Sequence, residues 1–326
     1  MIIDKDYETI LGESCLGAAI NNYLKYKKIN IESEVLFLLG GGFDLKYDEI
    51  SHEIKTNETY GNIYRKALRL LGLEYDYNNC KIDEWQFIRN VIDNEKMITL
   101  EVKSQFLNYD EIFINGKNSV HCFNIVAYNN EHRTVYLSDG FVPTAVPKCY
   151  EGWVQFDDIL TGWQQNNNKY YIFLFSDFKI TKEIYNRIDK IIYLNLKNNL
   201  EKKSNNFTYV DRWRNFVFKS INNNSDKKKL IYNINFQLCF CGFIQSKVSF
   251  ANYICKKNFN SELKTNLVDC IKKWKIIRLK FYRLAYQYDE DVKIIINKEI
   301  MENNYCELQL LKKIQQNMEC AIKKND

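Results

Sequence analysis

The chain has 326 residues, of which 46% are hydrophobic and 15% aromatic, so it can bury the cores of two globular domains. Its formal net charge of +5 is mild for 39 kDa and does not indicate a nucleic-acid-binding protein. The sequence lacks an apolar run of transmembrane length, and its start, Met1–Asp6, turns acidic at once, so we expect a cytoplasmic protein without membrane or nucleic-acid partners.

The ten cysteines of the chain have no regular spacing. In a chain of this size, that distribution fits reduced thiols better than a disulfide framework. The cysteines and the three histidines do not share the spacing of a metal site, so we expect no metal and no tightly bound cofactor.

The first predicted element is a helix that begins at Cys15, with Ser14 as its N-cap. The peptide N–H groups of a first helical turn carry partial positive charge, which favours a thiolate and can bind a developing oxyanion. Cys15 is therefore the candidate nucleophile, although most cysteines in such a chain are small buried side chains. Apolar residues at helical spacing predict that one face of this helix is buried: Leu16, Ala19, Ile20, Tyr23 and Leu24.

A glycine run, Gly40, Gly41 and Gly42, follows the apolar stretch from Glu34 to Leu39. Glycines let the backbone approach a ligand or another strand closely. The run is not a phosphate loop, because no Gly-Lys-Ser/Thr follows it. Two interpretations stay open: a substrate-binding segment, or a flexible connection between a helix and a strand.

Two β-rich segments, 121–128 and 134–139, flank the polar turn 129–133 and predict a hairpin. A turn centred on residue 130 would place His121 opposite Asp139, with Cβ atoms about 5 Å apart. A register slip of one residue would send the two side chains to opposite faces.

Cys15, His121 and Asp139 can serve as nucleophile, base and orienter in one scheme. The other histidines fit less well, because His132 lies in a turn and His52 in a charged stretch. Each member also has a structural interpretation: a buried thiol, a structural histidine, and an Asp-Gly turn.

The pattern changes near residue 178, which predicts two domains, 1–178 and 179–326. Before the change, β-type segments dominate after the first helices; after it, apolar residues recur at helical intervals. Lysine pairs in the second half form solvated helix faces or a docking surface for an acidic partner. The predicted strands outside the hairpin are 98–102, 153–156 and 170–175, and the predicted helical segments are 180–203, 230–256, 261–288 and 292–322.

Cys15–Ala19, the run from Glu34 to Gly42, His121 and Asp139–Gly140 together resemble the N-terminal domain of the butirosin biosynthesis protein H family. The helical second half, with Trp274 in a long helix, is similar to that family's second domain. The resemblance implies an α+β protein: a papain-like cysteine-peptidase fold, with an N-terminal helix packed on an antiparallel sheet, followed by a mostly helical domain. The amide-forming cysteine-protease homologue of closthioamide assembly is a similar case.

The resemblance also implies roles. Cys15 would be the nucleophile, His121 the base and Asp139 its orienter, in an acyltransferase of antibiotic or other specialised-metabolite biosynthesis. The enzyme would take an acyl group from a phosphopantetheine thioester on an acyl or peptidyl carrier protein and deliver it to a small-molecule amine. We expect the helical domain to shape the acceptor pocket or dock the carrier, and Gly40–Gly42 to admit the pantetheine arm.

One departure from the papain-like pattern concerns the oxyanion hole. Papain-like peptidases usually place a Gln several residues before the cysteine, whereas this chain has Tyr7–Ser14 there, without Gln. The second oxyanion donor is therefore unassigned. Two alternatives stay open: a cysteine peptidase or thioesterase of the same fold, and a binding protein that keeps a papain-like shell.

Overall fold

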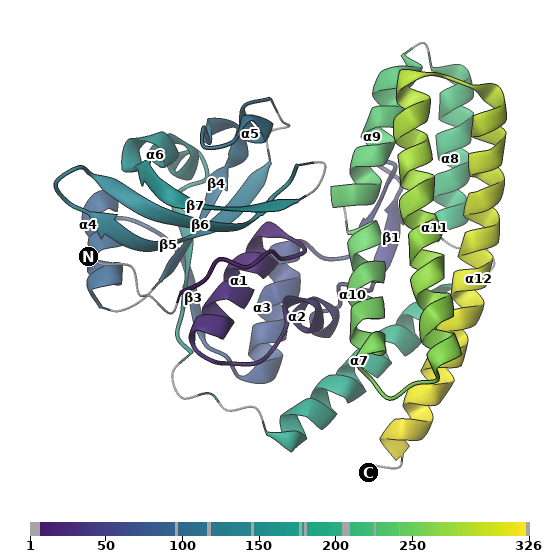
Figure 1. Cartoon of the computed structure of the whole chain (residues 1–326), viewed down its shortest axis with the longest axis horizontal. Helices are drawn as coiled ribbons and strands as arrows, with labels where there is room; N and C mark the ends of the chain where they lie inside the picture. The colour runs from purple at the N-terminus through teal and green to yellow at the C-terminus, as the bar shows by residue number, and fades with distance from the viewer. Residues whose placement is uncertain are drawn as a thin grey trace. The chain divides into compact units, whose positions relative to one another are not determined.

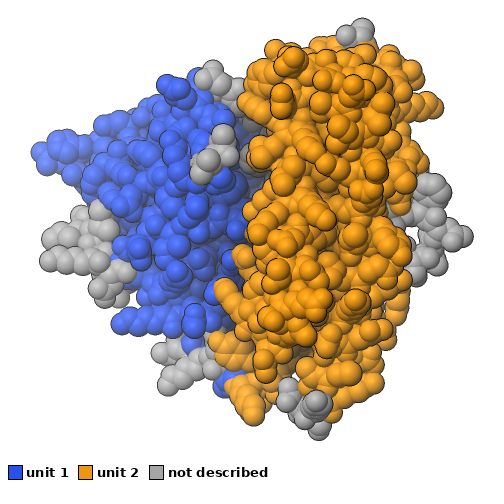
Figure 2. Space-filling model, turned by 45° about the vertical axis from the view of Figure 1, so that its right-hand side comes forward, with its two compact units in different colours: residues 1–36, 64–181 blue, residues 37–63, 182–326 orange. Residues whose placement is uncertain are grey.

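The computed structural model describes residues 7–94, 97–115, 119–144, 147–175, 178, 181–203, 209–224, 226–240 and 242–323. The chain divides into two compact units, drawn in blue and orange in Figure 2. Unit 1 comprises residues 1–36 and 64–181, and unit 2 comprises 37–63 and 182–326. The expected boundary at 178 lies close to the second division, whereas residues 37–63 group with the C-terminal helices.

Unit 1 combines helices with an antiparallel sheet, which confirms the predicted α+β class. The described strands follow the order β3-β8-β4-β5-β6-β7, and every neighbouring pair is antiparallel (Figure 1). The elements that lie wholly in unit 1 are α1 (Cys15–Tyr26), β3 (Tyr75–Asn79), α4 (Glu84–Asp93), β4 (Ile98–Lys103), the short 3-10 helix η1 (Ser104–Phe106), α5 (Glu111–Asn115), β5 (Val120–Asn129), β6 (Thr134–Val142), β7 (Lys148–Gln155), α6 (Phe156–Gln164) and β8 (Lys169–Phe173).

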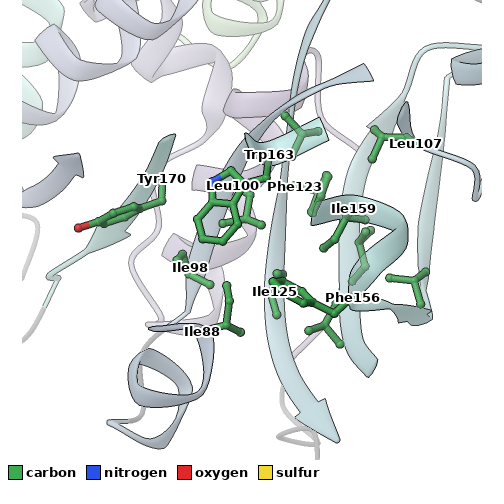
Figure 3. Packing of buried hydrophobic residues seen from close by; sticks show 14 of the residues in the cluster. Ile88, Ile98, Leu100, Leu107, Phe123, Ile125, Phe156, Ile159, Trp163 and Tyr170 are labelled. Carbon is green, nitrogen blue, oxygen red and sulfur yellow. The ribbon is translucent and has the colours of Figure 1, made fainter. Parts of the chain in front are cut away.

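The two faces of this sheet are covered differently because side chains alternate along each strand. Phe123 and Ile125 of β5 point into an apolar core that includes Trp163 of α6 (Figure 3). Asn124, between them, faces α1, where its Nδ2 donates to the carbonyl of Ala19 at 2.9 Å. Helix α1 is thus fixed to the face opposite the apolar core, as the expected packing of an N-terminal helix on the sheet requires.

The hairpin of β5 and β6 forms, but its register differs from the predicted one. Ser138 pairs with Asn124, so Asp139 falls two residues short of the position opposite His121. The shift arises from a bulge between Ile125 and Ala127 and from a turn in which the side chain of Asn129 accepts backbone N–H groups. Because the displacement is two residues, His121 and Asp139 still share a face as diagonal neighbours.

Unit 2 consists of a short hairpin and helices, which confirms the predicted mostly helical C-terminal half. Its apolar core joins Leu45 and Ile54 of the hairpin to Trp213, Trp274 and Phe281 of the helices. The elements are β1 (Leu45–Asp48), β2 (Glu53–Thr56), α7 (Lys182–Lys203), α8 (Tyr209–Asn223), α9 (Lys227–Phe240), α10 (Phe243–Cys255), α11 (Ser261–Tyr286) and α12 (Glu290–Lys323), while α2 (Ser33–Leu39) and α3 (Tyr60–Leu71) each run across a division between the units.

The helical segment predicted over 230–256 is not continuous. It is divided between α9 and α10, and Gly242, the residue before α10, has a left-handed φ of 91°. A side chain would be strained in that conformation, so glycine marks the break. Helix α8 was not predicted. In the described ranges, no helix is both long and apolar enough to cross a membrane.

Candidate active site

Cys15 is the first residue of α1, as predicted, and Ser14 is the N-cap. The Ser14 backbone is extended, and its Oγ accepts from the N–H of Gly17 at 3.3 Å. The same Oγ lies 3.0 Å from the hydroxyl of Tyr64 on α3. A Cβ on Gly17 would lie 2.1 Å from that hydroxyl, so glycine is required for Tyr64 to reach the cap. Cys15 as a whole residue is half-buried.

The segment before Cys15 lies against β6, which fixes the start of α1. The N–H of Gly12 donates to the carbonyl of Gly140 at 3.0 Å, and the N–H of Ile10 donates to Asn22 Oδ1 at 3.0 Å. A Cβ on Gly140 would lie 2.5 Å from the carbonyl oxygen of Ile10. The glycine after Asp139 therefore allows the N-terminal segment to approach β6 closely.

His121 and Asp139 form a buried hydrogen-bonded pair. Nε2 of His121 lies 2.7 Å from Oδ2 of Asp139, and both side chains are almost fully inaccessible to solvent. The Tyr109 hydroxyl donates to the same Oδ2 at 2.7 Å, and the N–H of Phe141 donates to Oδ1 at 2.9 Å. The ring of Phe113 packs against the imidazole at 4.7 Å between centroids. These contacts hold the imidazole in one orientation.

Cys15 completes the group, because its thiol shares a side-chain hydrogen bond with His121. Since Nε2 of His121 is occupied by Asp139, Nδ1 is the ring nitrogen left to face the sulfur. Burial lowers the pKa of His121, but the charge and hydrogen bond of Asp139, with a further contribution from Cys15, raise that pKa to about 10. The structure thus brings the three predicted residues together.

A fourth residue, Cys122, belongs to this group and was not predicted. Its hydrogen bond to Cys15 is the largest cause that holds the pKa of Cys15 well below its usual value; burial opposes it, and the hydrogen bond and charge of His121 reinforce it. Cys122 keeps its proton, because the Cys15 contact and burial both raise its own pKa. Strand alternation places Cys122 on the same face of the sheet as Asn124, which is the face that α1 covers. This alternation was the signal in the sequence that could have identified Cys122.

The glycine run lies at the C-terminal end of α2, in the other compact unit. Gly41 has a φ of 95°, and the N–H of Gly42 donates to the carbonyl of Phe37 at 2.8 Å, which closes the helix. A Cβ on Gly40 would lie 1.9 Å from the carbonyl oxygen of Ile63, and one on Gly42 would lie 2.4 Å from the Phe37 ring. The helix end and its packing therefore require these glycines, and their predicted role in substrate binding stays a prediction.

Residues 14–140 match the family model described as butirosin biosynthesis protein H, N-terminal, which confirms the predicted resemblance over this part of the chain. The comparison with curated proteins gave no match. Among solved structures, a protein described as a C39-like peptidase from Bacillus anthracis is similar at 12% identity with a TM-score of 0.37, over 54% of this chain and 98% of that one. In the described part of the chain, no three His, Cys, Asp or Glu side chains gather in a way that would hold a metal ion.

Proposed function

We propose that the protein is a thiol-dependent acyltransferase that forms an amide by way of an acyl-enzyme on Cys15. The observation that carries the thiol chemistry is the group of Cys15, His121 and Asp139, in which the pKa of the thiol is lowered and that of the imidazole is raised. Such a pair exists as thiolate and imidazolium near neutral pH, which is the state required of a cysteine nucleophile.

In the first half-reaction, the Cys15 thiolate attacks the carbonyl carbon of an acyl thioester on the phosphopantetheine arm of a carrier protein. The carbon–sulfur bond to the arm then breaks, the imidazolium of His121 gives its proton to the leaving thiolate, and the acyl group stays on Cys15. Asp139 keeps Nε2 of His121 occupied, so that Nδ1 faces the sulfur throughout.

In the second half-reaction, a small-molecule amine attacks the acyl-enzyme and loses a proton to the neutral His121 imidazole. The carbon–sulfur bond breaks, Cys15 leaves as the thiolate, and the amide is released. The backbone N–H groups at the start of α1 are the proposed oxyanion donors, because a first helical turn leaves such groups without an intrahelical acceptor. Transfer instead of hydrolysis requires that the amine displaces water from the site.

The choice of acyl transfer over peptide cleavage is supported by the match of residues 14–140 to the butirosin biosynthesis protein H family, whose name places its namesake in the synthesis of butirosin. A thioester is an activated acyl donor, so its cleavage depends less on a complete oxyanion hole than cleavage of a peptide does. The absence of the upstream Gln is compatible with that difference.

The direct test is intact-mass measurement after incubation with carrier proteins charged with an acyl thioester. We expect the wild-type chain to gain the mass of one acyl group and to lose it, as an amide, when an amine is added. Cys15→Ala should gain no mass, whereas Cys149→Ala, which removes another half-buried thiol, should behave as the wild type.

Undiminished transfer by Cys15→Ala would exclude covalent catalysis at this residue. Rapid loss of the acyl group to water, with no dependence on the amine, would instead favour a thioesterase. Cleavage of peptides without any carrier-borne substrate would favour a cysteine peptidase. A Cys15 thiol that is alkylated no faster than the other thiols near neutral pH would favour a binding protein.

A further inference from the structure

Helix α11 presents apolar side chains on the face turned away from the core of unit 2. Helix α11 lies beside α9, α10 and α12 (Figure 1). Its buried residues, such as Trp274 and Phe281, belong to the apolar core of this unit. The exposed apolar residues recur at intervals of three and four, which places them on the opposite face. These are Ile276, Leu279, Tyr282 and Tyr286, with exposed fractions of 49%, 51%, 42% and 62%.

The same stretch of α11 is strongly basic. Residues 272–286 contain six lysines and arginines and no acidic residue, whereas the whole chain has a net charge of +5. Lys272 is paired with Asp269, and Lys280 is paired with Glu299 of α12. Within the described residues, neither Lys275 nor Arg283 has an acidic partner. Both are exposed, and their positions in the sequence place them on the same face of α11 as the four exposed apolar residues.

We propose that this face of α11, defined by Lys275, Ile276, Leu279, Tyr282, Arg283 and Tyr286, is the docking surface for an acidic carrier protein that brings the acyl thioester. The inference rests on the proposed function, which requires such a protein partner. Tyrosine and arginine are enriched in protein interfaces, and an apolar centre with a charged rim is their usual arrangement.

The charge of the face selects the partner. Lys275 and Arg283 are complementary to a helix that carries carboxylates, and such complementarity speeds encounter and fixes orientation. A nucleic acid would bind the basic residues and could stack on the tyrosines, but it has no apolar surface that would bury the aliphatic side chains of Ile276 and Leu279. An acidic protein surface with exposed apolar side chains satisfies both kinds of residue.

The test compares two pairs of charge reversals. Lys275→Glu/Arg283→Glu changes the α11 face, and Lys66→Glu/Lys81→Glu changes two exposed lysines of unit 1 by the same total charge. The probes are fluorescently labelled acyl and peptidyl carrier proteins in their phosphopantetheinylated form. We expect the α11 pair to weaken binding by about tenfold or more at low salt, with a smaller effect at high salt, and the unit 1 pair to leave binding unchanged. Leu279→Ser should weaken binding at all salt concentrations.

A kinetic comparison separates docking from chemistry. For the α11 variants, kcat/KM for the carrier-borne thioester should fall in proportion to the loss of binding, and kcat/KM for a free pantetheine thioester should stay unchanged. Binding of the carriers through α11 without any acyl transfer would support the docking surface while refuting the proposed function.

Several outcomes would overturn the docking surface. The wild type could bind none of the carriers, or both charge-reversed pairs could bind them equally well. The α11 variants could also lose as much turnover with the free thioester as with the carrier-borne one. Loss of binding to a single-stranded RNA or to anionic phospholipid vesicles, with carrier binding intact, would assign the face to those partners instead.

Discussion

Replacement of Asp139 by Asn should disrupt the thiolate–imidazolium pair while leaving the fold intact. The rise in the pKa of His121 from 6.5 to about 10 corresponds to a preference of about 5 kcal/mol for the imidazolium, at roughly 1.4 kcal/mol per unit. Asp139 provides most of the attraction, and Cys15 adds to it. Two charges about 4 Å apart attract by about 4 kcal/mol at an effective dielectric constant near 20, which equals roughly three pKa units.

Asp139→Asn should therefore bring the pKa of His121 from about 10 down to about 7, and the pKa of Cys15 should rise because it loses its cationic partner. An Asn can accept from His121 and Tyr109 only by turning its amide NH2 towards the N–H of Phe141, which leaves two donors facing each other. That conflict adds a cost of about 1–3 kcal/mol to stability.

The assay is the rate of Cys15 alkylation by iodoacetamide across pH, with the modified residue identified by mass spectrometry. At pH 6 the variant should react about 10–100-fold more slowly than the wild type, and the two rates should converge above pH 9. Tyr109→Phe is the matched control, because it removes a neutral hydrogen bond to Asp139 without removing the charge. If the pH profile of alkylation is unchanged in Asp139→Asn, the charge of Asp139 is not what keeps His121 protonated.

The same pair predicts the sign of a stability change with pH. A histidine whose folded pKa is raised stabilises the fold fully below its unfolded pKa, near 6.5, and this contribution is lost as pH rises through about 10. The lowered pKa of Cys15 acts in the opposite sense, because its contribution grows until the unfolded thiol also ionises near its ordinary pKa of 9.0. The two contributions offset each other up to about pH 9, so the difference in free energy of unfolding between the wild type and Asp139→Asn, measured with urea, should shrink chiefly as the pH is raised from about 9 to 10.

Three further predictions concern other contacts. Cys122→Ala removes the thiol that donates to Cys15, so the pKa of Cys15 should rise. Alkylation of Cys15 at pH 6 should then slow by about tenfold for each unit by which that pKa rises. Cys80→Ala, which removes another buried cysteine, should leave the rate unchanged. Gly140→Ala forces a contact with the Ile10 carbonyl and should lower the free energy of unfolding, measured by urea titration, by about 1–3 kcal/mol. Gly152→Ala is the control and should cost less, because the nearest atom to its new Cβ is the flexible end of Tyr150 at 3.2 Å. Lys247→Met leaves the buried Glu307 without its ammonium partner and should lower the free energy of unfolding by about 3–5 kcal/mol. The double variant Lys247→Met/Glu307→Leu should recover most of this loss. Equal stabilities of the single and the double variant would contradict a buried ion pair.

Local patterns in the sequence were sufficient to predict several elements. The start of α1 at Cys15 followed from the Ser14 cap and the apolar spacing behind it. Long helices such as α11 and α12 followed from their periodicity, because an amphipathic pattern sustained over many turns is hard to mistake.

The register of the β5–β6 hairpin could not be predicted in the same way. It depends on the bulge near Ile125 and on the turn built around Asn129, and neither has a unique signature in the sequence. The short hairpin of β1 and β2 was missed for a related reason. Its strands are only four residues long, and an apolar-polar alternation over so few residues, such as Leu45 to Asp48, is too short to distinguish a strand from a loop.

Tertiary contacts account for the remaining differences. Cys122 looks like any other buried cysteine until α1 is placed against the same face of the sheet as Asn124. Residues 37–63 were assigned to the first domain by their position in the chain, but Leu45 and Ile54 pack with Trp213 and Trp274. Contacts between residues so far apart in the sequence leave no local pattern.

The interleaving of the two units constrains how the protein can fold during synthesis. The segment 37–63 leaves the ribosome early, yet Leu45 and Ile54 share a core with Phe281 and Ile300, which are made more than two hundred residues later. Such a high contact order is associated with slow folding, because a large loop must close before the contacts form. Unit 2 therefore cannot complete its core until its last helices have been made, and a chain that stops after residue 181 would leave the early hairpin without its partners and prone to aggregation.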